Sequence, residues 1–212
     1  MPYLSAQEFE TVLLSKPLDL IVEEFIFQGE PYVFRNQFAF FNLLIKHLSK
    51  ELGVAEQNMT IVGSAKVGFS LNPENFPRQF SETSDIDVLV ISEQLFDTIW
   101  MTLLKWHYPR RFVSLGKTEG EWQQRRRKEI FWGWLVPNEI QYEGISFPEV
   151  LKPLRDLSVK WFNAFQSLSL YPEFAARTVT GRLYRTREHA LRYHVEGLRQ
   201  IHSRLVRTRK GG

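Results

Sequence analysis

The spacing of apolar residues predicts an α+β fold, in which helices cover a small mixed β-sheet. Residues 60–62 and 86–91 are short apolar runs rich in Val and Ile, bounded by turn or acidic residues, as is typical of buried strands. From residue 34 to residue 52 the apolar residues recur three and four positions apart, which predicts an amphipathic helix that ends near Gly53. The same spacing returns twice in the last third of the chain, so we expect more helix than strand.

The first half of the chain is expected to contain helices and two strands. Each boundary carries a turn or capping residue, because Gly and Pro break regular structure and Ser can cap a helix. The expected elements are a mainly helical segment at residues 6–28, a helix at 34–52, a strand at 60–62, a short helix from Ser64, a strand at 85–91 and a helix at 93–108. One short helix and a long loop therefore separate the two strands.

The second half is expected to begin with two further strands, at residues 110–115 and 130–136. The polar segment between them contains the basic run Arg125 to Lys128, which suits either contact with a triphosphate or a nucleic-acid backbone, or an exposed loop or helix face. Helices at residues 154–170 and 187–205 follow, and the apolar side chains of each lie on one face.

The charge distribution divides the chain into two parts. Residues 177–212 hold ten Lys and Arg against two Glu, a net charge of +8, so the net charge of +3 for the whole chain leaves −5 on residues 1–176. The basic tail is expected either to contact a polyanion or an acidic partner protein, or to be a solvated helix face with a disordered end. We expect residues 1–150 to form the core with its N-terminal helices, and residues 151–212 to form a helical C-terminal extension with a basic tail.

Composition excludes several other classes of protein. With 43% hydrophobic and 14% aromatic residues in 212 positions, the chain can build a substantial core, and without cysteine it has no disulfide or thiolate metal site. No two of the 5 histidines lie four positions apart and no Gly-x-Ser-x-Gly motif occurs, so helical zinc sites and serine-hydrolase chemistry lack support. No apolar run of about 18 residues and no signal-peptide pattern is present, so we expect a cytoplasmic protein without a membrane span.

The most specific motif joins a Gly-Ser turn to a pair of aspartates. Gly63 and Ser64 follow the first strand, and Asp85 and Asp87 open the second. Side chains alternate along a strand, so both carboxylates are expected to project from the same face. Two carboxylates beside a turn with free backbone N–H groups suit a nucleoside triphosphate bound with Mg²⁺.

This motif resembles that of the nucleotidyltransferase superfamily of DNA polymerase β type, in which Gly-Ser or Gly-Gly precedes an Asp-apolar-Asp strand. The string from Gly63 to Leu71 is also similar to the version found in bacterial antiviral and toxin-type nucleotidyltransferases. The resemblance covers residues 30–140. It implies a small mixed sheet of nucleotidyltransferase type packed by helices.

The resemblance also implies roles for individual residues. Asp85 and Asp87 would hold two Mg²⁺ ions and act as catalytic carboxylates. Gly63, Ser64 and the N–H groups of the short helix would bind the β- and γ-phosphates, and Lys66 would add a positive charge there.

Two features depart from the family pattern. Gly63 and Asp85 lie 22 positions apart, and the extra residues 72–83 are expected to form an ordered loop over the site. The family usually has a third carboxylate on a later strand, and the acid nearest to such a strand here is Glu129. Glu129 is therefore a candidate catalytic carboxylate, with a solvated residue at a strand edge as the alternative.

The resemblance implies metal-dependent transfer of a nucleotide from an NTP, with ATP as the expected donor, to a protein, an RNA or a second nucleotide. The bacterial enzymes it resembles suggest a role in antiviral defence or in a toxin–antitoxin system. The alternative is a catalytically degenerate subunit of the same fold, which binds nucleotide or nucleic acid within a defence complex. The basic C-terminal helix is the expected contact for a protein partner or a nucleic acid.

Overall fold

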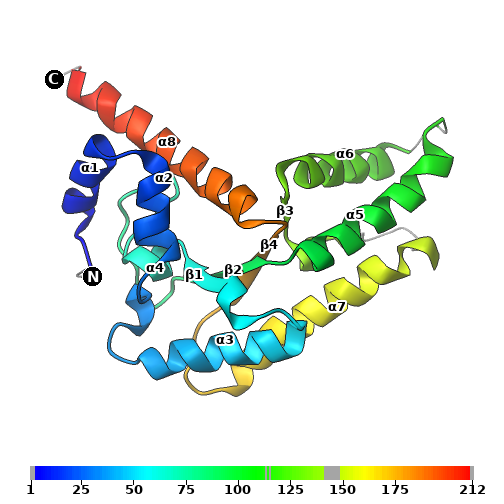
Figure 1. Cartoon of the computed structure of the whole chain (residues 1–212), viewed down its shortest axis with the longest axis horizontal. Coiled ribbons are helices and arrows are strands. Elements are labelled where there is room, and N and C mark those ends of the chain that lie inside the picture. The colour runs from blue at the N-terminus through cyan, green and yellow to red at the C-terminus, as the bar shows by residue number, and fades with distance from the viewer. Residues whose placement is uncertain (1–2, 113, 115, 141–148, 211–212) are drawn as a thin grey trace.

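One mixed sheet of four strands forms the centre of the molecule (Figure 1). The computed structural model describes residues 3–112, 114, 116–140 and 149–210. Within these residues the strand order is β1-β2-β4-β3, with β1 and β2 antiparallel, β2 and β4 parallel, and β4 and β3 antiparallel. The strands are β1 (Met59–Val62), β2 (Ile86–Ile91), β3 (Trp134–Leu135) and β4 (Val179–Tyr184). β2 and β4 therefore form the middle of the sheet.

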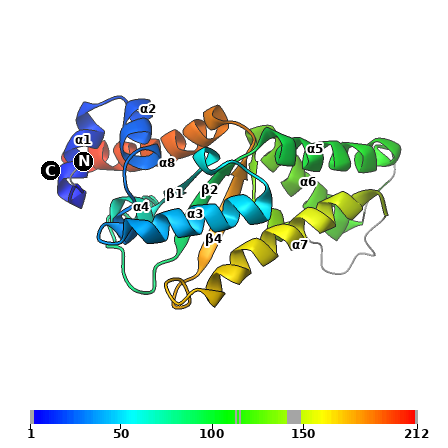
Figure 2. The same cartoon turned by 60° about the horizontal axis from the view of Figure 1, so that its bottom comes forward.

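Helices cover both faces of the sheet (Figure 2). The α-helices of the described residues are α1 (Ala6–Ser15), α2 (Leu18–Ile21), α3 (Phe38–Leu52), α4 (Ser64–Val67), α5 (Glu93–His107), α6 (Lys117–Trp132), α7 (Lys152–Gln166) and α8 (Arg187–Lys210). The predicted α+β class is confirmed, whereas the nucleotidyltransferase type of the sheet stays a prediction. None of the helices in the described part of the chain is long and apolar enough to span a membrane.

Side-chain alternation along β2 separates two packing layers. Ile86, Val88 and Val90 are buried in the cluster that contains the apolar faces of α3, α5 and α7. Leu89 is buried in a second cluster, with apolar residues of α1, α2 and α8. Asp87 lies on the same face as Leu89, at the edge of that second layer.

The first half of the chain folds largely as its sequence predicts. The helical segment at residues 6–28 consists of α1, α2 and a π-helix at Val22–Phe27. α3 ends at Gly53, whose φ of 71° is left-handed. Ser92 caps α5, because its hydroxyl accepts a hydrogen bond of 3.2 Å from the N–H of Leu95. Local spacing and capping signals therefore determine these elements.

The strand predicted at residues 130–136 is wrong in its first half. α6 extends to Trp132, Gly133 ends it with a φ of 68°, and only the two-residue β3 follows. Two ion pairs within α6 favour the helix, since Glu129 lies 3.2 Å from Arg125 and 2.8 Å from Arg126. The polar segment before Ile130 is thus part of the same helix.

The strand predicted at residues 110–115 is also wrong for the part of that segment that the structure describes. Tyr108–Arg110 forms a 3-10 turn that closes α5, and residues 111 and 112 continue as a turn. Residues 113 and 115 lie outside the described residues. Pro109 favours this turn, because its fixed φ suits the first positions of a helical turn.

The central strand β4 is not predicted by the sequence pattern, because Gly181 and Arg182 interrupt its apolar residues. Gly181 has a packing role, since a Cβ atom built on it would lie 2.2 Å from Cζ of Phe165 in α7. β4 lies between α7 and α8 in the chain, so the segment after residue 150 contributes to the sheet as well as the expected helices. The division at residue 150 into a core and an extension stays a prediction.

Gly181→Ala should lower the free energy of unfolding by about 1–3 kcal/mol, because the added methyl group overlaps the Phe165 ring in a buried site. Urea unfolding followed by circular dichroism measures the change. Phe165→Leu removes the ring and should therefore reduce the cost of Gly181→Ala in the double variant. A Gly181→Ala protein as stable as the wild type would contradict this packing.

Candidate functional site

Gly63 brings the end of β1 against the Asp87 carboxylate. Val62 pairs with Asp87 in the sheet, and Gly63 follows with φ 67° and ψ −150°, a conformation that side chains disfavour. A Cβ atom at Gly63 would lie 3.1 Å from Oδ2 of Asp87. The backbone therefore approaches the carboxylate closely only because residue 63 has no side chain. The predicted turn into a short helix is present, since α4 begins at Ser64.

Two carboxylates and one hydroxyl lie together where β2 begins. Asp87 is exposed, and Asp85, two positions earlier along the same extended segment, is exposed as well. The register pairs Asp87 with Thr180 of β4, and Oγ1 of Thr180 donates a hydrogen bond of 2.7 Å to Oδ1 of Asp87. The neighbouring strand thus presents a hydroxyl group, not a third carboxylate, beside Asp87.

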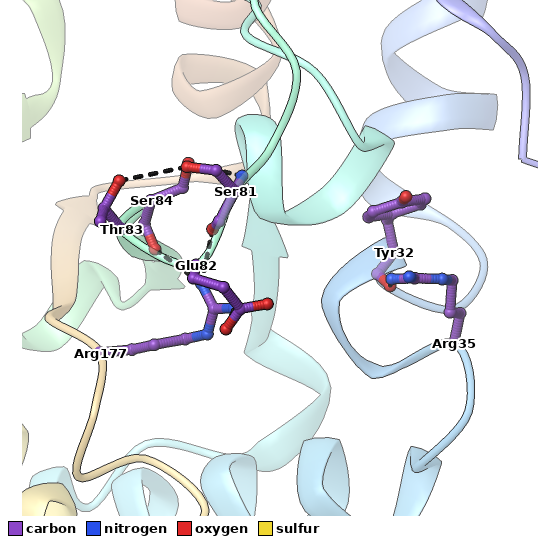
Figure 3. Close-up of polar contacts among 7 residues, drawn as sticks. All are labelled: Tyr32, Arg35, Ser81, Glu82, Thr83, Ser84 and Arg177. Atoms are coloured by element: carbon purple, nitrogen blue, oxygen red, sulfur yellow. Dashed lines mark hydrogen bonds and ion pairs between the residues drawn. The ribbon is translucent and has the colours of Figure 1, made fainter.

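Arg177 fixes the end of the loop that leads into the aspartate pair (Figure 3). Its Nη1 donates to the carbonyl oxygens of Ser81 and Ser84, at 2.8 and 3.2 Å. Its Nη2 forms a 3.0 Å ion pair with Glu82, which is itself almost fully exposed. Ser84 directly precedes Asp85, so a residue just before β4 holds the backbone from which the Asp85 side chain projects.

Aromatic rings and guanidinium groups contact one another in series from Arg177 to Arg35. The Arg177 guanidinium lies 4.9 Å from the ring centroid of Phe80, and Phe80 meets the ring of Tyr32 edge to face at 6.2 Å. The Arg35 guanidinium lies 4.0 Å from the Tyr32 centroid, and Figure 3 shows this pair across from the loop. Gly68 leaves room for Tyr32, because a Cβ atom there would lie 2.9 Å from the ring.

The structure does not bring Lys66 to the aspartate pair. Its side chain is 3% exposed, and Nζ donates to the carbonyl oxygen of Gly29. Two residues correspond to about 200° of rotation in a helix, so Lys66 and Ser64 point to opposite sides of α4. Lys66 instead lines a pocket under the N-terminal segment, whose walls include Phe9, Phe25 and other aromatic residues. Burial lowers the pKa of Lys66 to about 8.

Glu129 belongs to α6, which leads into β3 at the edge of the sheet (Figure 1). α6 leads directly into β3, where Trp134 pairs with Tyr184, whereas Asp87 pairs with Thr180. Thr180 and Tyr184 are four residues apart along β4, which corresponds to about 13 Å. The structure therefore does not place Glu129 among the groups around Asp85 and Asp87.

Glu129 instead forms ion pairs within α6. Its Oε1 accepts a 3.2 Å hydrogen bond from Arg125, and its Oε2 lies 2.8 Å from Nη1 of the buried Arg126, at an angle outside the hydrogen-bond range. Burial raises the pKa of Glu129, and the two arginines act against that rise. These contacts describe a structural carboxylate that neutralises a buried guanidinium.

Three arginines of the basic C-terminal segment each contact an acid. Arg185 pairs with Asp97 at 2.8 Å, Arg192 with Glu188 at 2.7 Å and Arg199 with Glu196 at 3.5 Å. Farther along α8, Arg204 donates to the backbone carbonyls of Pro73 and Phe76, and so ties the helix to the long loop before β2. A nucleic-acid or protein contact through this helix stays a prediction.

Sequence reasoning missed Thr180, Arg177 and Tyr32. Each is remote in sequence from the aspartate pair, and no local motif marks it. Their relation to the site depends on the β2–β4 register and on the path of the loop before Asp85. Among the described residues, no group of three or more His, Cys, Asp or Glu side chains is placed to hold a metal ion.

The chain has no significant match among protein-family models, curated proteins or solved structures.

Lys66→Met should change how stability depends on pH. Lys66 has a pKa of about 8 in the folded protein, against its ordinary value of 10.5. Below pH 8 the lysine is protonated in both states, so burial of its charge opposes folding in full. Between pH 8 and 10.5 the unfolded chain binds more protons, so the stability of the wild type rises with pH.

The measured quantity is the difference in unfolding free energy between wild type and Lys66→Met, from urea titrations at several pH values between 7 and 10. We expect the unfolding free energy of the wild type to increase relative to that of Lys66→Met as pH rises. Lys46→Met is the matched control, because Lys46 is exposed on α3. If the two variants show the same pH dependence, Lys66 does not carry a buried charge.

Proposed function

We propose that the chain binds a nucleoside triphosphate with Mg²⁺ at Asp85 and Asp87 and transfers its nucleotidyl group to an acceptor hydroxyl. The observation that carries this proposal is the close approach of Gly63 to the Asp87 carboxylate, where a Cβ atom would lie 3.1 Å from Oδ2, with the exposed Asp85 two positions before Asp87. A side-chain-free turn next to two exposed carboxylates suits a phosphate chain that bridges backbone and metal.

The residues present fit a magnesium ion. Mg²⁺ prefers oxygen donors and is typically bound through one or two carboxylates together with substrate phosphates and water. Asp85 and Asp87 supply two exposed carboxylates, and the Thr180 hydroxyl holds one oxygen of Asp87 in place. When bound, Mg²⁺ would stabilise the negative charge on the transferring phosphate and on the leaving pyrophosphate. The number of ions, two by the resemblance, stays a prediction.

In the proposed reaction, the oxygen of an acceptor hydroxyl attacks the α-phosphorus of the NTP. A new O–P bond forms, the bond from the α-phosphorus to the oxygen that bridges to the β-phosphorus breaks, and pyrophosphate leaves with that electron pair. The hydroxyl proton is released to solvent. Gly63 leaves room for the phosphates, Thr180 orients Asp87, and Arg177 holds the backbone before Asp85.

The family resemblance supports the donor and the setting of this proposal. ATP is the proposed donor, and a protein, an RNA or a second nucleotide is the acceptor. The proposed setting is cytoplasmic, in bacterial antiviral defence or a toxin–antitoxin system.

A second candidate function is nucleotide binding without transfer, within a defence complex. One observation favours it, because β4 presents Thr180 beside Asp87 where a third carboxylate would complete the metal site. A pyrophosphate-release assay with MgATP separates the two candidates. If the protein binds MgATP and releases pyrophosphate, the result supports nucleotidyl transfer. If it binds MgATP without releasing pyrophosphate, the result supports the second candidate.

Asp85→Asn combined with Asp87→Asn should abolish Mg²⁺-dependent stabilisation by ATP and leave the fold intact, since both side chains are exposed. A ligand at 100 times its Kd stabilises a protein by about 2.7 kcal/mol, so the shift in melting temperature is measurable. Melting curves with MgATP, with ATP and EDTA, and without ligand provide the comparison. If the double variant keeps the wild-type shift, the carboxylates do not hold the metal.

Gly63→Ala should weaken MgATP binding at least tenfold in calorimetric titration. The new methyl group would lie 3.1 Å from Asp87 and occupy the space that a phosphate needs. Gly53→Ala is the matched control, because Gly53 also has a positive φ but caps α3 away from the site. Equal affinities of the two variants would contradict the role proposed for Gly63.

A further inference from the structure

α6 exposes two large aromatic rings at its C-terminal end. The side chain of Phe131 is 78% exposed and that of Trp132 is 61% exposed. The rings contact each other edge to face, with centroids 5.2 Å apart. Adjacent exposed rings of this size are unusual on a protein surface and indicate an interaction site.

Within the described part of the chain, the basic run before these rings contains two cations that pair with acids and two that do not. Arg125 pairs with Glu129 and Glu139, and the buried Arg126 pairs with Glu129. Arg127 and Lys128 are exposed, and neither has an acidic partner among the residues that the structure describes. The charge available to a ligand therefore lies on Arg127 and Lys128.

The free cations and the exposed rings share one side of the helix. Residues four positions apart are neighbours on a helix surface, so Arg127 lies beside Phe131 and Lys128 beside Trp132. Glu129 and Gly133 are buried on the opposite side. We call these four exposed residues, Arg127, Lys128, Phe131 and Trp132, the α6 face.

We infer that the α6 face binds single-stranded nucleic acid. Unpaired bases stack on exposed aromatic rings, and phosphates contact the adjacent cations, without a need for a defined sequence. The helix polarity gives this contact a direction. Phe131 and Trp132 lie at the negative C-terminal end of α6, which favours bases there and phosphates one turn earlier, at Arg127 and Lys128.

Charge complementarity favours this occupant over a protein. Arg127 and Lys128 are exposed cations that match the charge of a phosphate backbone, and cations beside exposed rings are the recurring features of single-strand binding surfaces. Double-stranded nucleic acid cannot use the rings, because its bases are already stacked. The inference is independent of the proposed function, since α6 leads into β3, which pairs with β4 at Tyr184, whereas Asp87 pairs with β4 at Thr180.

The first experiment measures fluorescence anisotropy of a labelled U12 oligoribonucleotide and a labelled T12 oligodeoxynucleotide, without Mg²⁺ or NTP. Phe131→Ala combined with Trp132→Ala should weaken the binding of both at least tenfold, because each lost stack costs affinity. The slope of log affinity against log salt should stay unchanged. The matched control is Phe162→Ala, which removes a ring of α7 that is 52% exposed.

The second experiment repeats the titration across a salt series with Arg127→Gln combined with Lys128→Gln. Each phosphate contact with a single strand adds about 0.7 to the salt slope, so the slope should fall by about 1.4. Lys46→Gln with Lys50→Gln is the control, because it removes two exposed cations from α3. Both α6 variants exchange exposed side chains and should melt at the wild-type temperature.

Three outcomes would overturn the inference. Wild-type protein that binds neither oligonucleotide at low salt excludes a nucleic-acid surface. If both α6 variants still bind the oligonucleotides but Arg207→Gln with Arg209→Gln does not, the binding surface is α8 and not the α6 face. Concentration-dependent self-association without oligonucleotide binding, abolished by Phe131→Ala with Trp132→Ala, makes the α6 face a protein interface. Loss of MgATP binding in the aspartate variant bears only on the proposed function.

Discussion

Parallel backbone pairing between β2 and β4 positions most of what surrounds the aspartate pair. The register runs from Ile86 opposite Val179 to Ile91 opposite Tyr184, and it joins segments more than 90 residues apart in the chain. Thr180 reaches Asp87 only because this register sets the two residues side by side. The same pairing carries Arg177 to the backbone before Asp85. A shift of one residue would turn Thr180 to the opposite face and remove both contacts.

The elements that the sequence predicts correctly are stabilised by local interactions, whereas the element that it misses depends on residues far away in the chain. β2, α3 and α5 are predicted because their own side-chain spacing and caps determine them. β4 depends on partners that a local pattern does not contain. Gly181 accommodates the Phe165 ring, and the Arg182 guanidinium lies 4.7 and 4.5 Å from the rings of Trp134 and Tyr193. Such residues are interpretable only once their neighbours are known.

The candidate site divides in the same way. Gly63 and Asp87 are predictable because strand alternation and a tight turn are local properties, and the structure brings them together. Lys66 is close to Ser64 in sequence but does not lie at the same site. Two residues of helix rotate its side chain away from Ser64 and into a buried pocket. Glu129 shows another limit, since its position relative to the aspartates depends on whether residues 130–132 form strand or helix.

Charge balance around the aspartate pair decides what can bind there. Arg177 is committed to two carbonyl groups and Glu82, Arg35 lies over the Tyr32 ring, and Lys66 faces away. Arg177 and Lys66 are therefore not free to neutralise a triphosphate beside the two carboxylates. Under the proposed function, a nucleotide at this position would depend on Mg²⁺ to offset the repulsion between its phosphates and Asp85 and Asp87. Nucleotide affinity and metal affinity would then be coupled, so that each ligand would raise the affinity for the other.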